Sequence, residues 1–324
     1  CLAGWLYGGR ALLMPLAFAD RGVDRSGSIA TWFGVGLLAT PLLIAGFAWA
    51  GATASGYAGM FVALGLLDAA LVGWLIRQTV IGRPARVRGA VWGLLFALLC
   101  ALLTWFSGPL VEHLSDAWWH MGNIANMRDT AGMALPFRNH SFGPFSSGLL
   151  SSLGVDFSTY RLQAILSAAT GHSVLEVWYA TSVVVSGLLS ISVLLLIRSV
   201  LDDTRAVVLA AMFWLLILGG MNTGFRVAGW PAGMGYIFLN LGILASWMFW
   251  SGSSKREASV LLGVSVVGAA LFHLAEVYLL AVGIAILLAT ALLIRPAQGF
   301  RSLLFPAVMI AGIGLAYWGG LGVG

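Results

Sequence analysis

Asp116 and His120 form the pair of side chains whose types and spacing most clearly suggest chemistry. They occur in the run SDAWWH, which directly follows an apolar segment. In a helix they lie one turn apart on the same face, so carboxylate and imidazole can share a proton, a metal or a substrate hydroxyl. An acid at a membrane surface is costly unless it has a partner, which favours a functional role for Asp116 over a structural one. The two tryptophans of the run are typical of interfacial anchors.

His273 and Glu276 form a second pair one helical turn apart, in the turn between two apolar segments. Ionisable groups in such a place are functional candidates by default. The alternative is a hydrogen-bonded histidine that caps a helix hairpin.

Two arginines in polar loops are candidate anion-binding residues: Arg138, in PFRNH, and Arg226, in NTGFR. A guanidinium group suits a lipid-linked phosphate or diphosphate. A lipid headgroup contact or an ion pair is the alternative for each. A divalent cation is an open expectation, because histidines and acids gather in the same region, but the sequence does not fix its ligands.

The composition indicates that lipid, rather than water, surrounds most of this chain. Of its 324 residues 60% are hydrophobic and 9% are charged, whereas soluble domains carry roughly a quarter charged residues. The net charge of +5 fits basic cytoplasmic loops rather than nucleic acid as a partner. No P-loop, GxSxG, HExxH or dinucleotide-binding motif occurs, so the enzyme chemistries that these motifs support are not indicated.

Apolar segments long enough to cross a bilayer recur along the whole chain. They predict an all-α, polytopic transmembrane helix bundle of about ten spans, at 1–19, 29–49, 55–76, 90–106, 173–197, 206–220, 235–251, 258–272, 275–294 and 303–319. One alternative treats 258–294 as a single kinked helix. The first residue is Cys and the last residues follow directly on an apolar segment, so we expect a piece of a longer chain.

The basic residues indicate the orientation of these spans. When loops are assigned alternately to the two sides, twelve of the 17 Lys and Arg residues fall on one side and four on the other. This bias predicts that 77–89 is cytoplasmic and that 107–172 is outside. All five histidines then lie at or near the outer side.

The outer segment 107–172 interrupts the membrane pattern and must hold Asp116 and His120 in place. Apolar residues at helical spacing predict an interfacial amphipathic helix over 110–131, with Asp116, His120 and Asn123 on its other face. A second short helix is predicted over 157–170, closed by Gly171. We divide the chain into N-terminal transmembrane helices, 1–89, and a core, 90–324.

From about residue 90 onward, this order of features resembles the C-type (GT-C) membrane glycosyltransferases that use polyprenyl-phosphate sugars. Span 90–106 leads into an outer loop with Asp116 near its start, and two surface helices follow. The runs YRLQ and TG, before the next span, and FHLAE, at the later outer turn, are similar to family features.

The resemblance implies a transferase that moves a sugar from a polyprenyl-phosphate donor to an acceptor on the outer face of a cell membrane, in a bacterium the inner one. Asp116 would be the general base and His120 would assist it, while His273 and Glu276 assist or hold a cation, and Arg138 and Arg226 stabilise the leaving phosphate. Membrane lipids and other membrane subunits are the expected partners. The alternatives are a transporter or flippase of a lipid-linked or small solute, and a non-catalytic structural subunit of a membrane assembly.

Overall fold

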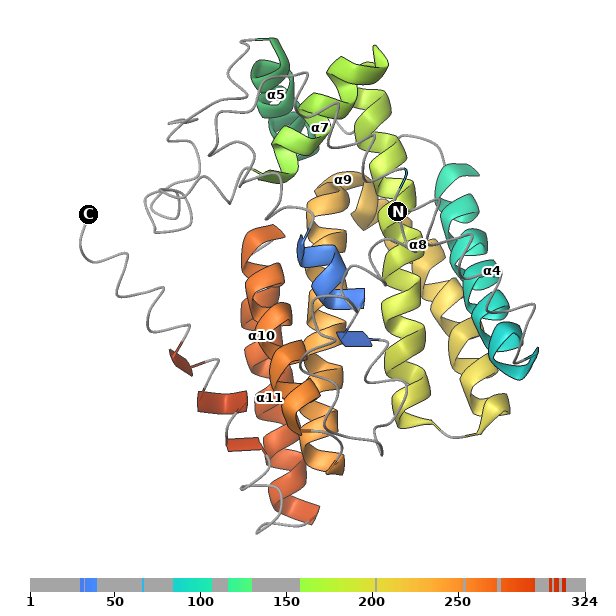
Figure 1. Ribbon diagram of the computed structural model, residues 1–324, viewed down its shortest axis with the longest axis vertical. Coiled ribbons are helices and arrows are strands. Elements are labelled where there is room, and N and C mark those ends of the chain that lie inside the picture. Colours follow the sequence, from blue (N-terminus) through green and yellow to red (C-terminus); the bar gives the residue numbers. More distant parts are fainter. Residues whose placement is uncertain are drawn as a thin grey trace.

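The computed structural model describes residues 30, 31, 33–39, 66, 84–106, 116–129, 158–201, 203–252, 255–272, 275–294, 303, 304, 306–308, 311 and 312. In this part of the chain all regular secondary structure is helical. Figure 1 shows long helices that run side by side, with the two short helices α5 and α7 across one end. The predicted all-helical class is therefore confirmed.

Helices α4 (Pro84–Phe106) and α8 (Val174–Val200) pack closely against each other. Helix α8 begins in a capping box, in which Ser173 and Glu176 satisfy each other's backbone amides. A Cβ atom on Gly187 would lie 3.1 Å from the carbonyl oxygen of Ala97, so glycine allows the close approach of the two backbones. Near the other end of the contact, the hydroxyl of Tyr179 donates to the carbonyl of Trp105.

All 48 residues of helix α9 (Thr204–Ser251) are helical. The helix is nevertheless strongly bent, so that its beginning and its end run in opposite directions beside α8 (Figure 1). Trp214 Nε1 donates to Ser190 Oγ at 3.1 Å, and Asn240 Nδ2 donates to Ser192 Oγ at 3.0 Å. A straight helix would separate Trp214 and Asn240 by about 40 Å, but both contact the same turn of α8. Helix α9 therefore has two limbs, which correspond to the predicted spans 206–220 and 235–251.

Helices α10 (Lys255–Phe272) and α11 (Ala275–Ile294) form a hairpin on the second limb of α9. Helix α10 runs antiparallel to this limb, since it follows the end of α9 and stacks Phe272 on Phe238 with ring centroids 5.6 Å apart. Helix α11 runs parallel to the limb, since Glu276 lies beside Gly235 and Leu280 beside Gly242. The alternative of one long kinked helix is wrong.

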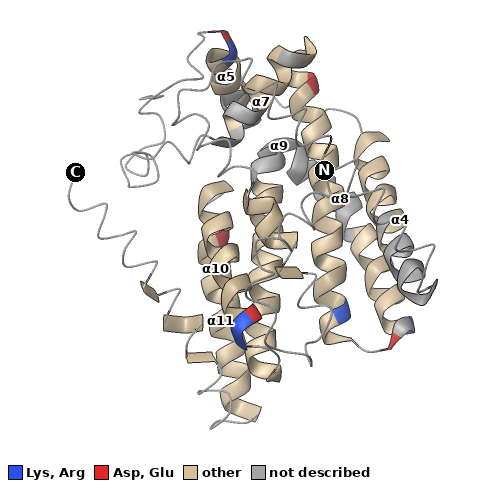
Figure 2. Ribbon diagram, viewed as in Figure 1, with Lys and Arg blue, Asp and Glu red and all other residues tan. Residues whose placement is uncertain are grey.

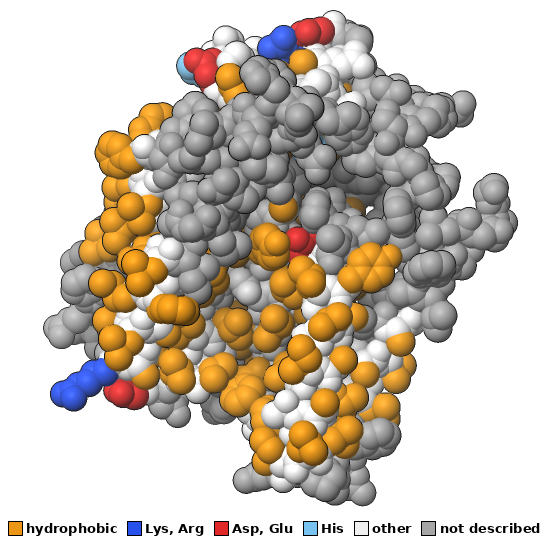
Figure 3. Space-filling view, turned by 180° about the vertical axis from the view of Figure 1, so that it is seen from behind, with side chains coloured by type: hydrophobic (Ala, Val, Ile, Leu, Met, Phe, Trp, Pro, Cys, Tyr) orange, Lys and Arg blue, Asp and Glu red, His pale blue; other side chains and the backbone are white. Residues whose placement is uncertain are grey.

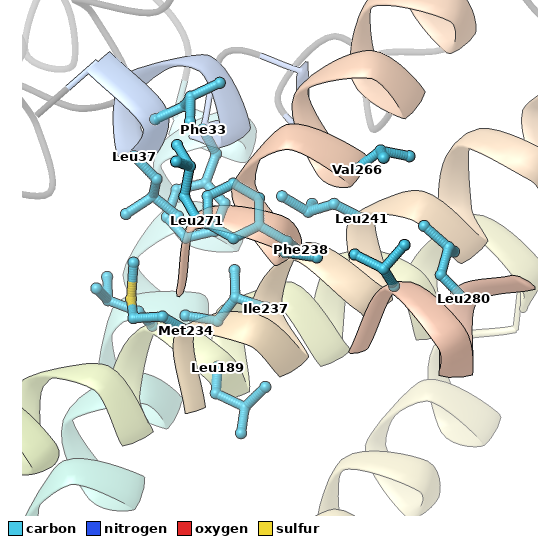
Figure 4. Close-up of a cluster of buried hydrophobic side chains, with 14 of the residues drawn as sticks. Phe33, Leu37, Leu189, Met234, Ile237, Phe238, Leu241, Val266, Leu271 and Leu280 are labelled. Atoms are coloured by element: carbon cyan, nitrogen blue, oxygen red, sulfur yellow. The ribbon is translucent and has the colours of Figure 1, made fainter. Parts of the chain in front are cut away.

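The core lies where α8, α9, α10 and α11 meet. Figure 4 shows its large apolar side chains, among them Leu189 from α8, Phe238 and Leu241 from α9, and Leu280 from α11. Residues 33–39 also contribute to it, because Phe33 and Leu37 are buried and a Cβ on Gly34 would lie 3.1 Å from Leu241. Residues 33–39 thus pack on the bundle that follows them in the chain.

Within the part of the chain that the structure describes, three helices are long and apolar enough to cross a membrane: Val174–Val200, Ala232–Ser251 and Glu276–Ile294. Their outer surfaces expose large apolar side chains, including Leu293 at 86% and Ile286 at 61%, and Figure 3 shows apolar atoms over much of one face. Figure 2 shows charged residues at the end of α5, at both ends of α8 and at the beginnings of α9 and α10. Of the ten predicted spans, 1–19 lies outside the described residues, and 29–49, 55–76 and 303–319 are described only in part.

The two predicted helices of the outer segment are present as α5 (Asp116–Asp129) and α7 (Ser158–Thr170). Gly171 ends α7 with a φ of +71°, and its amide donates to the carbonyl of Ser167 at 3.0 Å. This is the left-handed helix end that the glycine predicted. Helix α5 buries Met121, Ile124 and Met127 and contacts α7, α8 and α9.

Candidate functional site

His120 lies in a cluster of aromatic rings from three helices. Its Nδ1 atom is hydrogen-bonded to the hydroxyl of Tyr160 on α7, and the two ring centroids are 5.5 Å apart. On its other side the imidazole stacks on Trp178 of α8, with centroids 5.6 Å apart and planes inclined by 20°. These contacts fix the orientation of the ring, because His120 is tied to both the neighbouring short helix and a long helix of the bundle.

Polar side chains continue from this cluster along the contact between α5 and α7. Asn123 is 9% exposed, Gln163 is 1% exposed and Ser167 is 2% exposed. Ser167 Oγ donates to the carbonyl of His172 at 2.7 Å and accepts from Arg128 Nη1 at 3.2 Å. We call the set His120, Asn123, Tyr160, Gln163 and Ser167 the polar seam.

The observed polar seam differs from the amphipathic pattern that was predicted for 110–131. The sequence placed Asn123 with His120 on a polar face opposite the apolar one. In the structure Asn123 is buried beside Ile124, and His120 is in contact with two other helices. The reason is that α5 packs on protein along several sides, so its polar residues serve contacts between helices as well as the surface.

Arg128 is already engaged by residues of α5 and α7. It donates from Nε to Asp129 Oδ1 at 2.7 Å, from Nη2 to Asp129 Oδ2 at 3.3 Å, and from Nη1 to Ser167. The hydrogen bond from this guanidinium lowers the pKa of Asp129 below its usual value. Arg128 and Asp129 are therefore both charged at neutral pH, and their opposite charges neutralise each other.

Glu276 is 1% exposed and is the second residue of α11. A Cβ on Gly235 would lie 2.7 Å from Glu276 Oε2, so only glycine at that position leaves room for the carboxyl group. Glu276 is therefore an ionisable group enclosed between α9 and α11, and its role in a site stays a prediction.

The other predicted site residues are described less fully. Asp116 is the first residue of α5, one turn before His120, and Arg226 lies in α9 between its two limbs, but neither side chain is within the described part of the chain. Arg138 and His273 lie outside the described residues. Helix α9 contacts both α5 and α11, the helices that carry His120 and Glu276. A cavity common to the two pairs stays a prediction.

Four residues of the site were not predicted from the sequence: Tyr160, Gln163, Ser167 and Trp178. A signal for the first three exists, since they recur at intervals of three and four on one face of α7. Trp178 carries no local signal, because its place beside His120 depends on how α5 packs on α8.

Among the described residues, no group of three or more histidines, cysteines and acids is placed to hold a metal ion. No protein-family model, curated protein or solved structure matches this chain. The site is therefore interpreted from its own geometry.

Proposed function

We propose that the protein is a membrane glycosyltransferase, which moves a sugar from a polyprenyl-phosphate donor to an acceptor hydroxyl on the outer face of a bacterial inner membrane. The observation that supports this proposal best is the arrangement at one end of the bundle. Helices α5 and α7 lie across that end (Figure 1), α5 begins at Asp116, and His120 is held one turn later by Tyr160 and Trp178.

In the proposed reaction Asp116 is the general base. The acceptor hydroxyl transfers its proton to the carboxylate of Asp116 as its oxygen attacks the anomeric carbon of the donor sugar. The bond between that carbon and the phosphate oxygen breaks, and polyprenyl phosphate leaves with the bonding electrons. Arg138 and Arg226 are proposed to stabilise its negative charge.

The bundle suits a donor with a lipid tail. Its helices expose large apolar side chains to the outside, such as Leu216 at 76% and Leu293 at 86%. A polyprenyl chain can lie against such a surface within the bilayer, while the sugar phosphate reaches the end of the bundle that carries α5 and α7. His273 and Glu276, at the turn between α10 and α11, are proposed to line the same outer cavity and to bind substrate or a divalent cation.

The experiment is a transfer assay with the full chain in detergent or nanodiscs. Polyprenyl-phosphate sugars with different sugar groups are supplied as donors together with crude cell-envelope lipid and glycan acceptors, and radiolabelled product is followed. Transfer that depends on Asp116 supports the proposal. Failure of transfer with every donor argues against it.

A second function is favoured by one observation, the enclosure of Glu276 between α9 and α11. Acids inside a membrane bundle are typical of proton or solute pathways in transporters. Uptake into proteoliposomes that is driven by a pH gradient and lost in Glu276→Gln would support a transporter. The transferase proposal predicts no such uptake.

A further inference from the structure

Gln163 is the one side chain on the described part of α7 whose polar atoms are buried without a hydrogen bond. It is 1% exposed, and neither Nε2 nor Oε1 has a partner within the part of the chain that the structure describes. A buried amide that loses its hydrogen bonds with water is destabilising, and native proteins rarely leave both ends of one unpaired. A group that the described residues do not supply is therefore needed to complete this amide.

The surroundings of Gln163 indicate what kind of group that is. Gln163 follows Tyr160 by three residues, so the two lie on the same face of α7. That face includes the partner of His120, whose imidazole also stacks on Trp178. An amide, a phenol, an imidazole and an indole thus occur together at one end of the bundle, where Figure 1 shows α5, α7 and the beginning of α8.

We propose that Gln163 and the His120–Tyr160–Trp178 cluster bind the hydroxyl groups of a neutral sugar ring. The amide offers one acceptor and a donor group side by side, and two neighbouring hydroxyls can donate to the first and accept from the second. Aromatic rings provide an apolar surface against which the C–H groups of a sugar can pack. This inference deepens the proposed function, on which it rests for the choice of a sugar as the ligand.

Charge at the site favours a neutral ligand. The described charged side chains nearest along α5 are Arg128 and Asp129, and they pair with each other. Arg128 also donates to Ser167, at the far end of the polar seam from His120. A sulfated or phosphorylated group would find no unengaged cation among the described residues of α5.

An ordered water molecule is the competing occupant, since waters commonly satisfy buried polar groups. The two occupants differ in what happens when the amide is removed. A site built for a ligand is destabilised by the unpaired amide when empty, so the empty protein melts at a higher temperature in Gln163→Leu. A water that completes the amide gives no such rise.

The test uses the full chain in detergent with methyl α-mannopyranoside, methyl β-glucopyranoside and methyl β-galactopyranoside as probes. Binding is followed by saturation-transfer NMR, and 2-methoxytetrahydropyran, which has the ring but no hydroxyls, is the negative control. Gln163→Leu is compared with Ala168→Gln, which places an amide on an exposed position of the same helix. Where Gln163→Leu does not fold, Gln163→Met replaces it.

We expect the wild type and Ala168→Gln to bind at least one glycoside and Gln163→Leu to bind it at least about tenfold more weakly, the equivalent of one lost hydrogen bond. The melting temperature of the empty Gln163→Leu protein should rise by about 2–4 °C. Absence of glycoside binding by the wild type, or equal binding by Gln163→Leu, would overturn the inference.

The outcomes also separate this inference from the proposed function. Glycoside binding that requires Gln163, without sugar transfer from any donor, would support the sugar site and refute the transferase proposal. Sugar transfer by the wild type with an unchanged KM in Gln163→Leu keeps the transferase and removes the sugar site.

Discussion

The imidazole of His120 on α5 is hydrogen-bonded to the hydroxyl of Tyr160 on α7, which lies 40 residues further along the chain. This bond joins α5 to α7 and holds the ring of His120 against Trp178. The orientation of the ring thus depends on residues from two other helices, and replacing either partner should release it.

The bond should appear as an energetic coupling between the two residues. We expect His120→Ala and Tyr160→Phe to be non-additive in thermal stability, with a coupling of about 0.5–3 kcal/mol, as is usual for residues in direct contact. A double-mutant cycle on the full chain measures it. Gly122→Ala combined with Tyr160→Phe is the control and should be additive, because none of the described residues places an atom within 4 Å of a Cβ at residue 122.

The position of the Glu276 carboxyl group should depend on the absence of a side chain at Gly235. A methyl group at residue 235 would lie 2.7 Å from Glu276 Oε2, so Gly235→Ala must displace a buried carboxyl group. We expect a loss of about 1–3 kcal/mol in unfolding free energy. Gly283→Ala is the matched control in the neighbouring helix, since its nearest atom would be 3.7 Å away.

Both glycine replacements gain the same intrinsic helix propensity, about 1 kcal/mol. The difference between the two variants therefore isolates the contact with Glu276. Equal melting temperatures for Gly235→Ala and Gly283→Ala would show that the carboxyl group is not held there.

The orientation of the bundle can be tested with single cysteines. We expect Asp20 to Gly27, Gly82 to Gly89 and Ser251 to Arg256 to share the cytoplasmic side, because most Lys and Arg residues fall there. A membrane-impermeant thiol reagent added to intact cells should not modify Arg86→Cys. It should modify Thr170→Cys, an exposed position on α7. Wild-type protein sets the background, and modification of Arg86→Cys from outside would refute the topology.

Several parts of the fold could be predicted from the sequence because each has a local cause. The apolar lengths of α8 and α11 and the glycine at residue 171 predict helix positions directly. Hydropathy predicted two spans, 206–220 and 235–251, although both belong to helix α9. The contacts of Trp214 and Asn240 with the same turn of α8 show that the two limbs of α9 lie side by side, as two spans would.

The site was harder to predict, because its members meet only through packing. His120 was identified from its spacing to Asp116, but its contacts are Tyr160 and Trp178, 40 and 58 positions further along the chain. The burial of Asn123 and Gln163 follows from α5 packing on α7, which no local pattern of either helix specifies. Pairs one turn apart are visible in a sequence, whereas contacts between helices are not.

Asp116 is proposed to be the general base of the sugar transfer. Asp116→Asn keeps the size of the side chain but removes the basic oxygen, so turnover should fall by roughly two to four orders of magnitude. Asp129→Asn is the matched control, because it makes the same change at the other end of α5, where the acid is exposed and paired with Arg128. It should keep near-normal turnover.

The most direct measurement is therefore sugar transfer from a polyprenyl-phosphate donor by wild type, Asp116→Asn and Asp129→Asn, matched for folded protein. We expect transfer by the wild type and by Asp129→Asn, and its loss in Asp116→Asn at an unchanged melting temperature. Near-normal transfer by Asp116→Asn, or a lowered melting temperature with activity retained, would contradict it.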